Sequence, residues 1–272
     1  MKKTQRLLVV FAAALVILSS TGCNKLKARD HLNKGVQAYK SSKFEQAIDD
    51  FQQAVALDPS LINARLYLAT AFAQQYIPGA DTAENNRYAE QAIDSYKQVL
   101  QVDPKNINSI KGIAYLYLQM KKFPLAKEYY KKASEADPND PEPYYSVAVI
   151  DWTQTYVPRQ EERAKLGLKP DDSLPAKDKK VCAQMKEQNS ANVQEGIDNL
   201  NKALQLRPDY DDAMAYLNLM YRERADIQCD DPAARAADLK TADEWVDKTM
   251  ATKKAKAEKQ PGTGGIVLDQ KQ

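Results

Sequence analysis

Small, aromatic and proline residues recur at fixed spacing through this 272-residue chain. The first set is Ala47, Phe51, Ala54 and Pro59, with successive offsets of 4, 3 and 5 residues. The same offsets return three times, with leucine replacing the aromatic residue in the last set: Ala92, Tyr96, Val99 and Pro104; Ala126, Tyr130, Ala133 and Pro138; Gly196, Leu200, Ala203 and Pro208. Apolar residues at three- and four-residue spacing predict amphipathic helices, and each proline ends its helix. The pattern therefore predicts an all-α protein built from repeated helix pairs.

The length of the repeat points to a known family. Pro104 and Pro138 are 34 residues apart, and a further small residue precedes each set. This period and pattern resemble the tetratricopeptide repeat, in which small residues let two helices cross closely and an aromatic ring fills the gap. The resemblance covers residues 28–253 and implies a right-handed solenoid of about five helix pairs. It also implies a binding scaffold, with no enzymatic activity expected.

The repeat register sets where the helices begin. The first helix of each pair is expected to start near these residues: Ala28, Ile62, Ile107 and Pro141. A fifth first helix is expected from about Asp211 to Asp226. Its partner should start at Asp231 and Pro232, because an acidic N-cap followed by proline favours a helix start. That last helix becomes lysine-rich, as expected of a terminal capping helix.

Two of the intervals between prolines exceed the basic period. Pro59 to Pro104 spans 45 residues and Pro138 to Pro208 spans 70. With a third insertion in the last pair, the extra residues fall near 75–87, 154–190 and 227–239. Each lies between the first and second helix of a pair, so all three are expected along one rim of the solenoid. Such a rim either carries function or reflects the tolerance of loops to insertion.

The N-terminus has the form of an export signal. Three basic residues precede an apolar run at 7–18, and small residues lead directly to Cys23. The run is shorter than the roughly 20 apolar residues of a membrane-spanning helix. Small residues before a cysteine resemble the bacterial lipobox, although Ser20 stands where leucine is commonest. This resemblance implies cleavage before Cys23 and acylation of that cysteine; the alternative is an ordinary signal peptide that is cut nearby.

These features predict the order of segments along the chain. Residues 1–22 would be removed as a lipoprotein signal peptide, and residues 23–27 would form a short lipid tether. The solenoid would follow, and the Gly-containing residues 254–272 would form a flexible tail. The protein would be anchored in the cell envelope through the lipid on Cys23, facing the periplasm from the outer membrane. The sequence does not indicate an oligomeric state.

Charge and composition exclude several functions. Without the three basic residues of the leader, the chain has 36 basic and 37 acidic residues, which argues against a nucleic-acid partner. His31 is the one histidine, so no Ser-His-Asp set or multi-histidine metal site can be assembled, and a packed histidine is expected there. We therefore expect no catalytic residue, metal or cofactor. An enzyme that uses a pair of carboxylates is the least favoured alternative.

The resemblance also implies where a partner would bind. First-helix positions that line the concave face in this family carry aromatic residues and one arginine in this chain: Tyr39, Tyr67, Tyr115, Tyr145, Trp152, Tyr216 and Arg222. The family's lysine and asparagine clamp for a C-terminal carboxylate is not expected, because its positions hold other residues except for one asparagine: Leu32, Val36, Tyr67, Asn108 and Gly112. We expect a protein or extended-peptide partner, bound in the groove or along the inserted rim. The alternatives are a glycan or cell-wall ligand, and aromatic rings that serve packing alone.

Two cysteines remain once Cys23 is acylated. Cys182 and Cys229 both fall at the inserted rim, in neighbouring repeats. An even number of cysteines in an oxidising compartment favours a disulfide between them, and two free thiols are the alternative.

Overall fold

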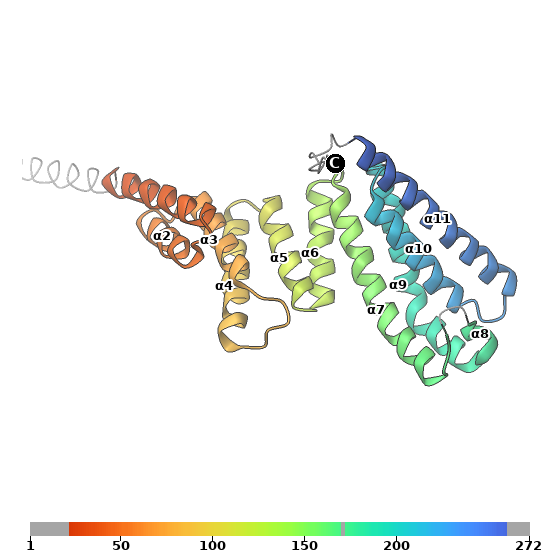
Figure 1. Cartoon of the computed structure of the whole chain (residues 1–272). Coiled ribbons are helices and arrows are strands. Elements are labelled where there is room, and N and C mark those ends of the chain that lie inside the picture. The colour runs from red at the N-terminus through yellow and green to blue at the C-terminus, as the bar shows by residue number, and fades with distance from the viewer. Residues whose placement is uncertain (1–21, 170–171, 260–272) are drawn as a thin grey trace, which may run out of the picture. The chain divides into compact units, whose positions relative to one another are not determined.

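The computed structural model describes residues 22–169 and 172–259, and every regular element in these ranges is a helix (Figure 1). The chain divides into two compact units, Met1–Ala136 and Asp137–Gln272. The expected leader lies outside the described residues apart from Gly22, as does the tail beyond Lys259. Both units are all-α stacks of helical hairpins, which is the predicted fold class.

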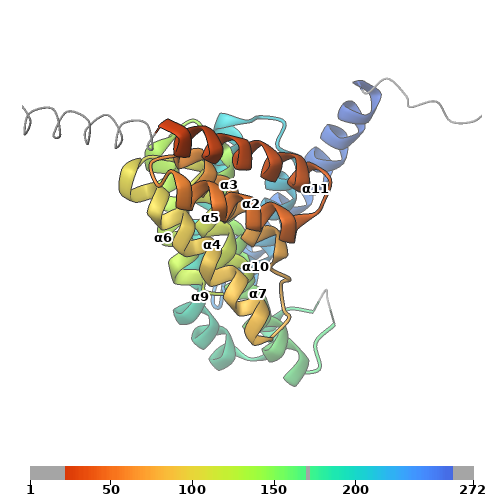
Figure 2. The same cartoon turned by 90° about the vertical axis from the view of Figure 1, so that its left-hand side faces the viewer.

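Unit 1 contains three helix pairs within its described residues. The first pair is the helix at 22–40 with α2 (Phe44–Leu57), and α3 (Ile62–Gln75) pairs with α4 (Ala83–Val102). The third pair is α5 (Ile107–Gln119) with α6 (Phe123–Ala136). From α2 to α6, each helix packs against the next one in sequence (Figure 2).

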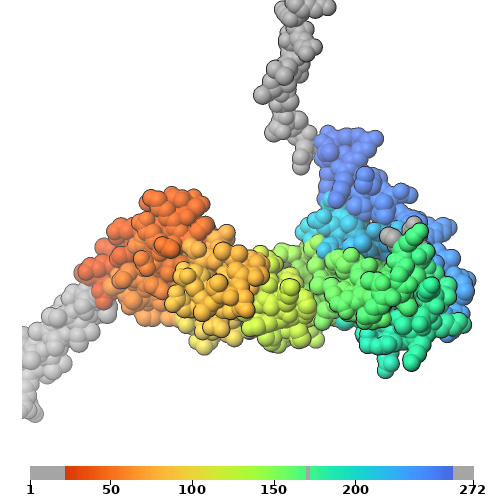
Figure 3. All heavy atoms as spheres, turned by 60° about the horizontal axis from the view of Figure 1, so that its bottom comes forward, coloured from red at the N-terminus to blue at the C-terminus, as the bar shows by residue number. Residues whose placement is uncertain are grey.

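The described residues of unit 2 form two longer pairs. α7 (Pro141–Lys165) packs against α9 (Lys179–Leu206), with the four-residue helix α8 (Leu174–Lys177) between them in sequence. α10 (Asp211–Asp226) packs against α11 (Pro232–Lys259), α9 and α7. Because it packs against α7, α9 and α11, α10 is the central element of unit 2. Figure 3 shows the surface of this unit, coloured from green in α7 to blue in α11.

The helix starts at Ile62, Ile107, Pro141 and Asp211 are those that the repeat register predicts. The ends of the chain differ from expectation. Residues 23–27, expected as a tether, are helical, because the first helix begins at residue 22 instead of near residue 28. Residues 254–259, expected in the tail, continue α11. Both segments lack glycine and proline, so nothing local stops the neighbouring helix.

The turns without insertions share a residue in the left-handed backbone conformation. Ser42 and Lys121 adopt positive φ angles of 57° and 56°. After each of them the chain reverses, with the Lys43 amide donating to the Ala38 carbonyl at 2.9 Å. The repeat with the largest insertion ends its first helix in the same way, at Gly167 with φ 65°, but only after α7 has run for 25 residues against 13 in α5. Much of this insertion is therefore added helix.

The small and aromatic residues of the repeat pack as their spacing implies. A Cβ on Gly35 would lie 2.5 Å from the Phe51 ring, and a Cβ on Gly112 would lie 2.6 Å from the Tyr96 ring. Only glycine leaves room for the ring at these two positions.

The first insertion is held by a buried side chain, since Asn85 accepts from the Ile77 amide at 2.7 Å and donates to two carbonyls of the same loop.

Candidate functional site

The three predicted groove aromatics of unit 1 lie on separate helices. Tyr39 packs edge-on against Phe44, with ring centroids 5.3 Å apart, and Tyr67 stacks on Phe51 at 5.6 Å. Tyr115 is half-exposed. Each of these rings is accessible in part.

The aromatic residues of unit 2 form a continuous surface, which we call the aromatic strip: Tyr145, Trp152, Tyr156 and Tyr216. Tyr216 of α10 makes edge contacts with both Tyr145 and Trp152 of α7, at 5.5 Å in each case. Trp152 in turn stacks on Tyr156 at 4.6 Å. Three of the predicted groove residues are thus brought together, and Tyr156 joins them. The helical spacing of Tyr156 from Trp152 is the sequence feature that could have identified it.

The strip is the outer edge of the core of unit 2. Tyr145, Trp152 and Tyr216 are partly buried and pack against core residues such as Leu217. The Trp152 indole nitrogen is buried and has no hydrogen-bond partner within the described residues. Burial also raises the pKa of the Tyr145 and Tyr216 phenols, so both stay neutral at physiological pH. Trp152 therefore contributes to packing as well as to the surface, and its expected role in recognition stays a prediction.

A cavity of about 800 Å³ adjoins the strip. It is formed by the last turns of α7, the end of α10 and the first half of α11. We call it the arginine cavity, because four arginines line it. The complete lining is Tyr156, Arg159, Gln160, Arg163, Leu168, Arg222, Asp226, Arg235, Leu239 and Asp243. Tyr156 belongs to both the strip and the cavity.

Buried ion pairs build one wall of the arginine cavity. Asp226 Oδ2 accepts from Arg163 Nη1 at 2.8 Å and from Arg159 Nη1 at 3.1 Å. Arg159 Nε lies 3.0 Å from Glu223 Oε1, and the Glu223 side chain is 1% exposed. Burial raises the pKa of Glu223 to about 7, although Arg159 opposes this shift. Arg163 also donates to the carbonyls of Lys169 and Asp172, which ties the connection after α7 to the wall.

The other two arginines differ from each other. Arg222, a predicted groove residue, donates to Asn218 Oδ1 at 2.9 Å and to Asp243 Oδ1 at 2.7 Å. It is thus engaged within α10 and α11. The Arg235 guanidinium has no hydrogen-bond or ion-pair partner among the described residues, and its Nε is buried. The sequence pattern does not indicate Arg235, because this residue lies at the start of α11, outside the repeat positions that line the groove.

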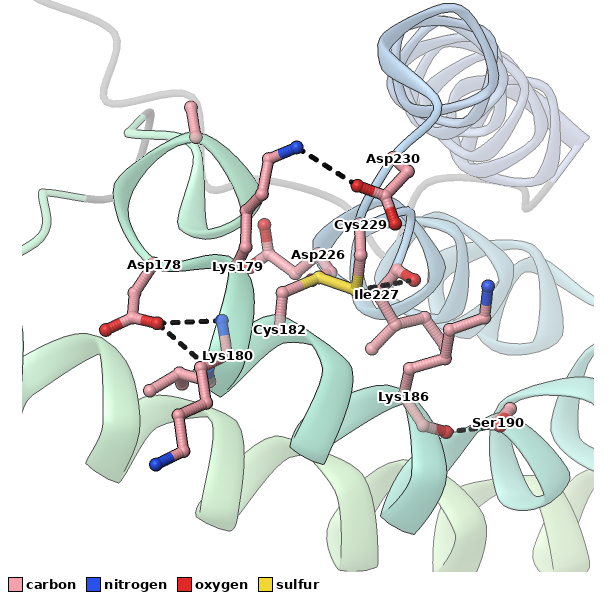
Figure 4. Close-up of a disulfide and its surroundings, with 12 residues drawn as sticks. Asp178, Lys179, Lys180, Cys182, Lys186, Ser190, Asp226, Ile227, Cys229 and Asp230 are labelled. Atoms are coloured by element: carbon pink, nitrogen blue, oxygen red, sulfur yellow. Dashed lines mark hydrogen bonds and ion pairs between the residues drawn. A yellow bond between two sulfur atoms is a disulfide. The ribbon is translucent and has the colours of Figure 1, made fainter.

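A disulfide holds the two inserted segments of unit 2 together (Figure 4). Cys182, buried in α9, is bonded to Cys229 in the loop between α10 and α11, with an S–S distance of 2.06 Å and a Cα–Cα distance of 5.6 Å. This is the pair suggested by the sequence. Beside it, Lys179 Nζ lies 3.1 Å from Asp230 Oδ1. A smaller cavity next to Cys229 shares Arg235 with the arginine cavity, so the disulfide lies close to the wall that carries Arg235.

The remaining candidate residues, His31 and Cys23, belong to neither the aromatic strip nor the arginine cavity. His31 Nδ1 lies 2.9 Å from Asp50 Oδ1, a contact between the first two helices. Within the described ranges, no three His, Cys, Asp or Glu residues are grouped so that they could hold a metal ion. Over the same ranges no helix combines the length and apolar character needed to cross a bilayer. Cys23 is an exposed free thiol.

Comparisons with known proteins identify the repeat. A tetratricopeptide-repeat family model matches residues 86–150. A solved structure titled as MamA protein has 11% identity and a TM-score of 0.57, covering 88% of this chain and 98% of that chain. MamA from Desulfovibrio magneticus RS-1 has 16% identity and a TM-score of 0.55, covering 84% and 96%.

A third solved structure is YrrB, titled as a tetratricopeptide-repeat protein with an unusual peptide-binding site. It has 14% identity and a TM-score of 0.52, covering 88% of this chain and 97% of that chain. At these identities the likeness shows the fold alone. No curated protein matches the sequence.

Proposed function

We propose that this tetratricopeptide-repeat protein is a lipid-anchored scaffold of the cell envelope that binds a partner protein or extended peptide on the aromatic strip of unit 2. The observation that carries the proposal is the strip itself. Its four rings are in continuous contact across α7 and α10, and they adjoin a large polar cavity. A tetratricopeptide-repeat fold and the peptide-binding site named in the YrrB title support a binding role.

The packing of the rings favours binding. Tyrosine and tryptophan offer a large apolar area with one polar group and lose few rotamers on binding. Because Tyr216 already contacts both Tyr145 and Trp152, and all three pack against the core, a partner would order little side-chain motion there. The exposed tyrosines of unit 1, Tyr67 and Tyr115, form no ring contact with each other and are weaker candidates.

A carboxylate-dependent enzyme fits the same residues poorly. Glu223 has a pKa near neutrality, as a general acid or base requires. However, its carboxylate is buried against Arg159, which separates it from the cavity. A substrate could not reach it without breaking this ion pair.

Site-specific photo-crosslinking tests the binding role. Replacing Tyr156 by benzoylphenylalanine places the crosslinker at the edge of the arginine cavity, which has room for the larger side chain. In the native host we expect one covalent adduct with a protein, and we expect Trp152→Ala to weaken its formation by about tenfold or more. The same crosslinker at Tyr115, an exposed tyrosine outside the strip, is the matched control and should not give this adduct.

Stability must be measured alongside, because Trp152 also packs against the core. Thermal unfolding of the Trp152→Ala variant shows whether it is folded at the crosslinking temperature. An adduct that a folded Trp152→Ala variant forms as well as the parent contradicts the proposal. Adducts with cell-wall polymer in place of protein would support the glycan alternative.

A further inference from the structure

We propose that the arginine cavity binds a carboxylate side chain of a peptide that lies on the aromatic strip, with Arg235 as its principal contact. This inference rests on the proposed peptide-binding function and adds to it that the bound segment is acidic. Three features carry it: the balance of charge in the cavity, the unpartnered guanidinium of Arg235, and the continuity of the cavity with the strip.

The charges around the cavity do not cancel. Four arginines line it, from α7, α10 and α11, against Asp226 and Asp243 in the lining and Glu223 behind it. Asp226 is shared by Arg159 and Arg163, and Asp243 is bound by Arg222. Glu223 faces Arg159. Among these four arginines and three carboxylates, one positive charge therefore remains even when all three carboxylates are ionised.

That excess charge is located on Arg235. The other three arginines each pair with a carboxylate. No hydrogen bond or ion pair joins the Arg235 side chain to another residue in the described part of the chain, and its Nε is removed from water. A buried donor without an acceptor is unfavourable, and the planar guanidinium matches a carboxylate through two parallel hydrogen bonds. A carboxylate that enters the cavity would therefore gain two charge-assisted hydrogen bonds and relieve this cost.

The shape of the cavity suits a side chain delivered from the strip. Its volume of about 800 Å³ is within the range of ligand-binding cavities. The Tyr156 ring stacks on Trp152 and also lines the cavity, so a peptide lying on the strip would reach the cavity within a few residues. Leu168 and Leu239 provide apolar surface for the methylene groups of a glutamate. Gln160 adds a further polar contact.

The walls are held in place before a ligand arrives. Arg163 ties the segment after α7 to Asp226, and the Cys182–Cys229 disulfide ties α9 to the loop that precedes α11. This preorganisation lowers the cost of ordering the site on binding. The site is distinct from the family's clamp for a C-terminal carboxylate. It is formed by the prolonged end of α7, the end of α10 and the start of α11, and the clamp positions hold other residues apart from Asn108.

Matched peptides provide the test. The probes are fluorescent, C-terminally amidated 12-residue peptides that carry two aromatic residues and one glutamate at varied spacing, together with the same peptides in which glutamine replaces glutamate. Anisotropy titration of the mature protein should show at least one glutamate peptide binding about tenfold more tightly than its glutamine partner. In Arg235→Gln this preference should fall to about twofold or less.

Lys240→Gln is the matched control, because it removes a positive charge from an exposed position on the same helix without altering the cavity lining. This variant should keep the preference for glutamate. Arg235→Lys retains the charge but loses the two-pronged geometry, so it should show an intermediate preference. Thermal unfolding of each variant establishes that it is folded.

The possible outcomes separate this inference from the function on which it rests. Equal binding of glutamate and glutamine peptides by the wild type, or a preference that survives Arg235→Gln, overturns the carboxylate site and leaves peptide binding intact. Failure of every peptide to bind contradicts both. Displacement of the glutamate peptides by submillimolar inorganic phosphate would show a site for a free anion and would also overturn the assignment.

Discussion

At the scale of single residues, Glu223 links stability to pH. Its pKa is about 7 in the folded protein against an ordinary value of 4.5, because burial disfavours its charged form. The folded state therefore holds the proton more tightly than the unfolded state. The free energy of unfolding should fall as the pH rises from about 4.5 to about 7, by about 3 kcal/mol from this group alone. Glu223→Gln mimics the protonated form, and Arg159 keeps Asp226 as its partner. Chemical denaturation should find this variant more stable than the wild type at pH 8, with the difference shrinking toward pH 5. Glu187→Gln, at an exposed position in the same unit, should leave the pH profile unchanged. Parallel profiles for the wild type and Glu223→Gln would contradict this assignment.

At the scale of the elements, the disulfide joins two segments that the helix pairs leave apart. It closes a loop of 47 residues between Cys182 of α9 and Cys229 before α11. Constraining the unfolded chain over a loop of this length stabilises the folded state by up to about 4 kcal/mol. Because Cys182 and Cys229 are bonded to each other, a Cys23→Ala variant has no free thiol. When it is unfolded without reductant in the presence of a maleimide, it should take up no label. Reduction should lower its resistance to denaturant. Labelling at two thiols before reduction would show that the bridge is absent from the purified protein. An unchanged denaturation midpoint after reduction would show that the bridge contributes nothing to stability.

At the scale of the whole molecule, the proposed anchor depends on Cys23. This residue is exposed and lies at the start of the helix at 22–40, only five residues before the buried Ala28. A helical segment of this length spans about 7.5 Å, against roughly 18 Å for an extended tether. Acylation of Cys23 would thus hold the first helix close to the membrane. We expect Cys23→Ala to move the protein from the membrane fraction to the soluble fraction, and mass spectrometry of the parent to find a lipid on this cysteine. Cys229→Ala is the control and should remain with the membrane. A Cys23→Ala variant that partitions like the parent and shows no difference in lipid mass would refute the anchor.

The sequence by itself determined the helix pairs and their register. Small residues, aromatic rings and prolines recur at offsets that a helix places on one face, so the sequence of each repeat specifies its own helix pair. Gly35 beneath Phe51 and the helix starts at Ile107 and Pro141 follow from this periodicity without knowledge of distant contacts. The assignment of Tyr145, Trp152 and Tyr216 to a groove rests instead on the resemblance to the tetratricopeptide repeat, because periodicity alone does not say which helix face is concave.

Only the tertiary structure decided which of these residues form a site. Tyr156 and Arg235 lie outside the repeat positions, and their importance comes from an insertion that prolongs α7 and from the fold of the loop before α11. The Arg163–Asp226 pair joins residues 63 positions apart, a separation that no period of the chain encodes. The pKa of Glu223 lies near 7 because its carboxylate is buried where α10 packs against α7, and this burial depends on how the prolonged helix packs. Repeat spacing determines local structure, whereas the charge balance of the cavity depends on contacts between inserted segments.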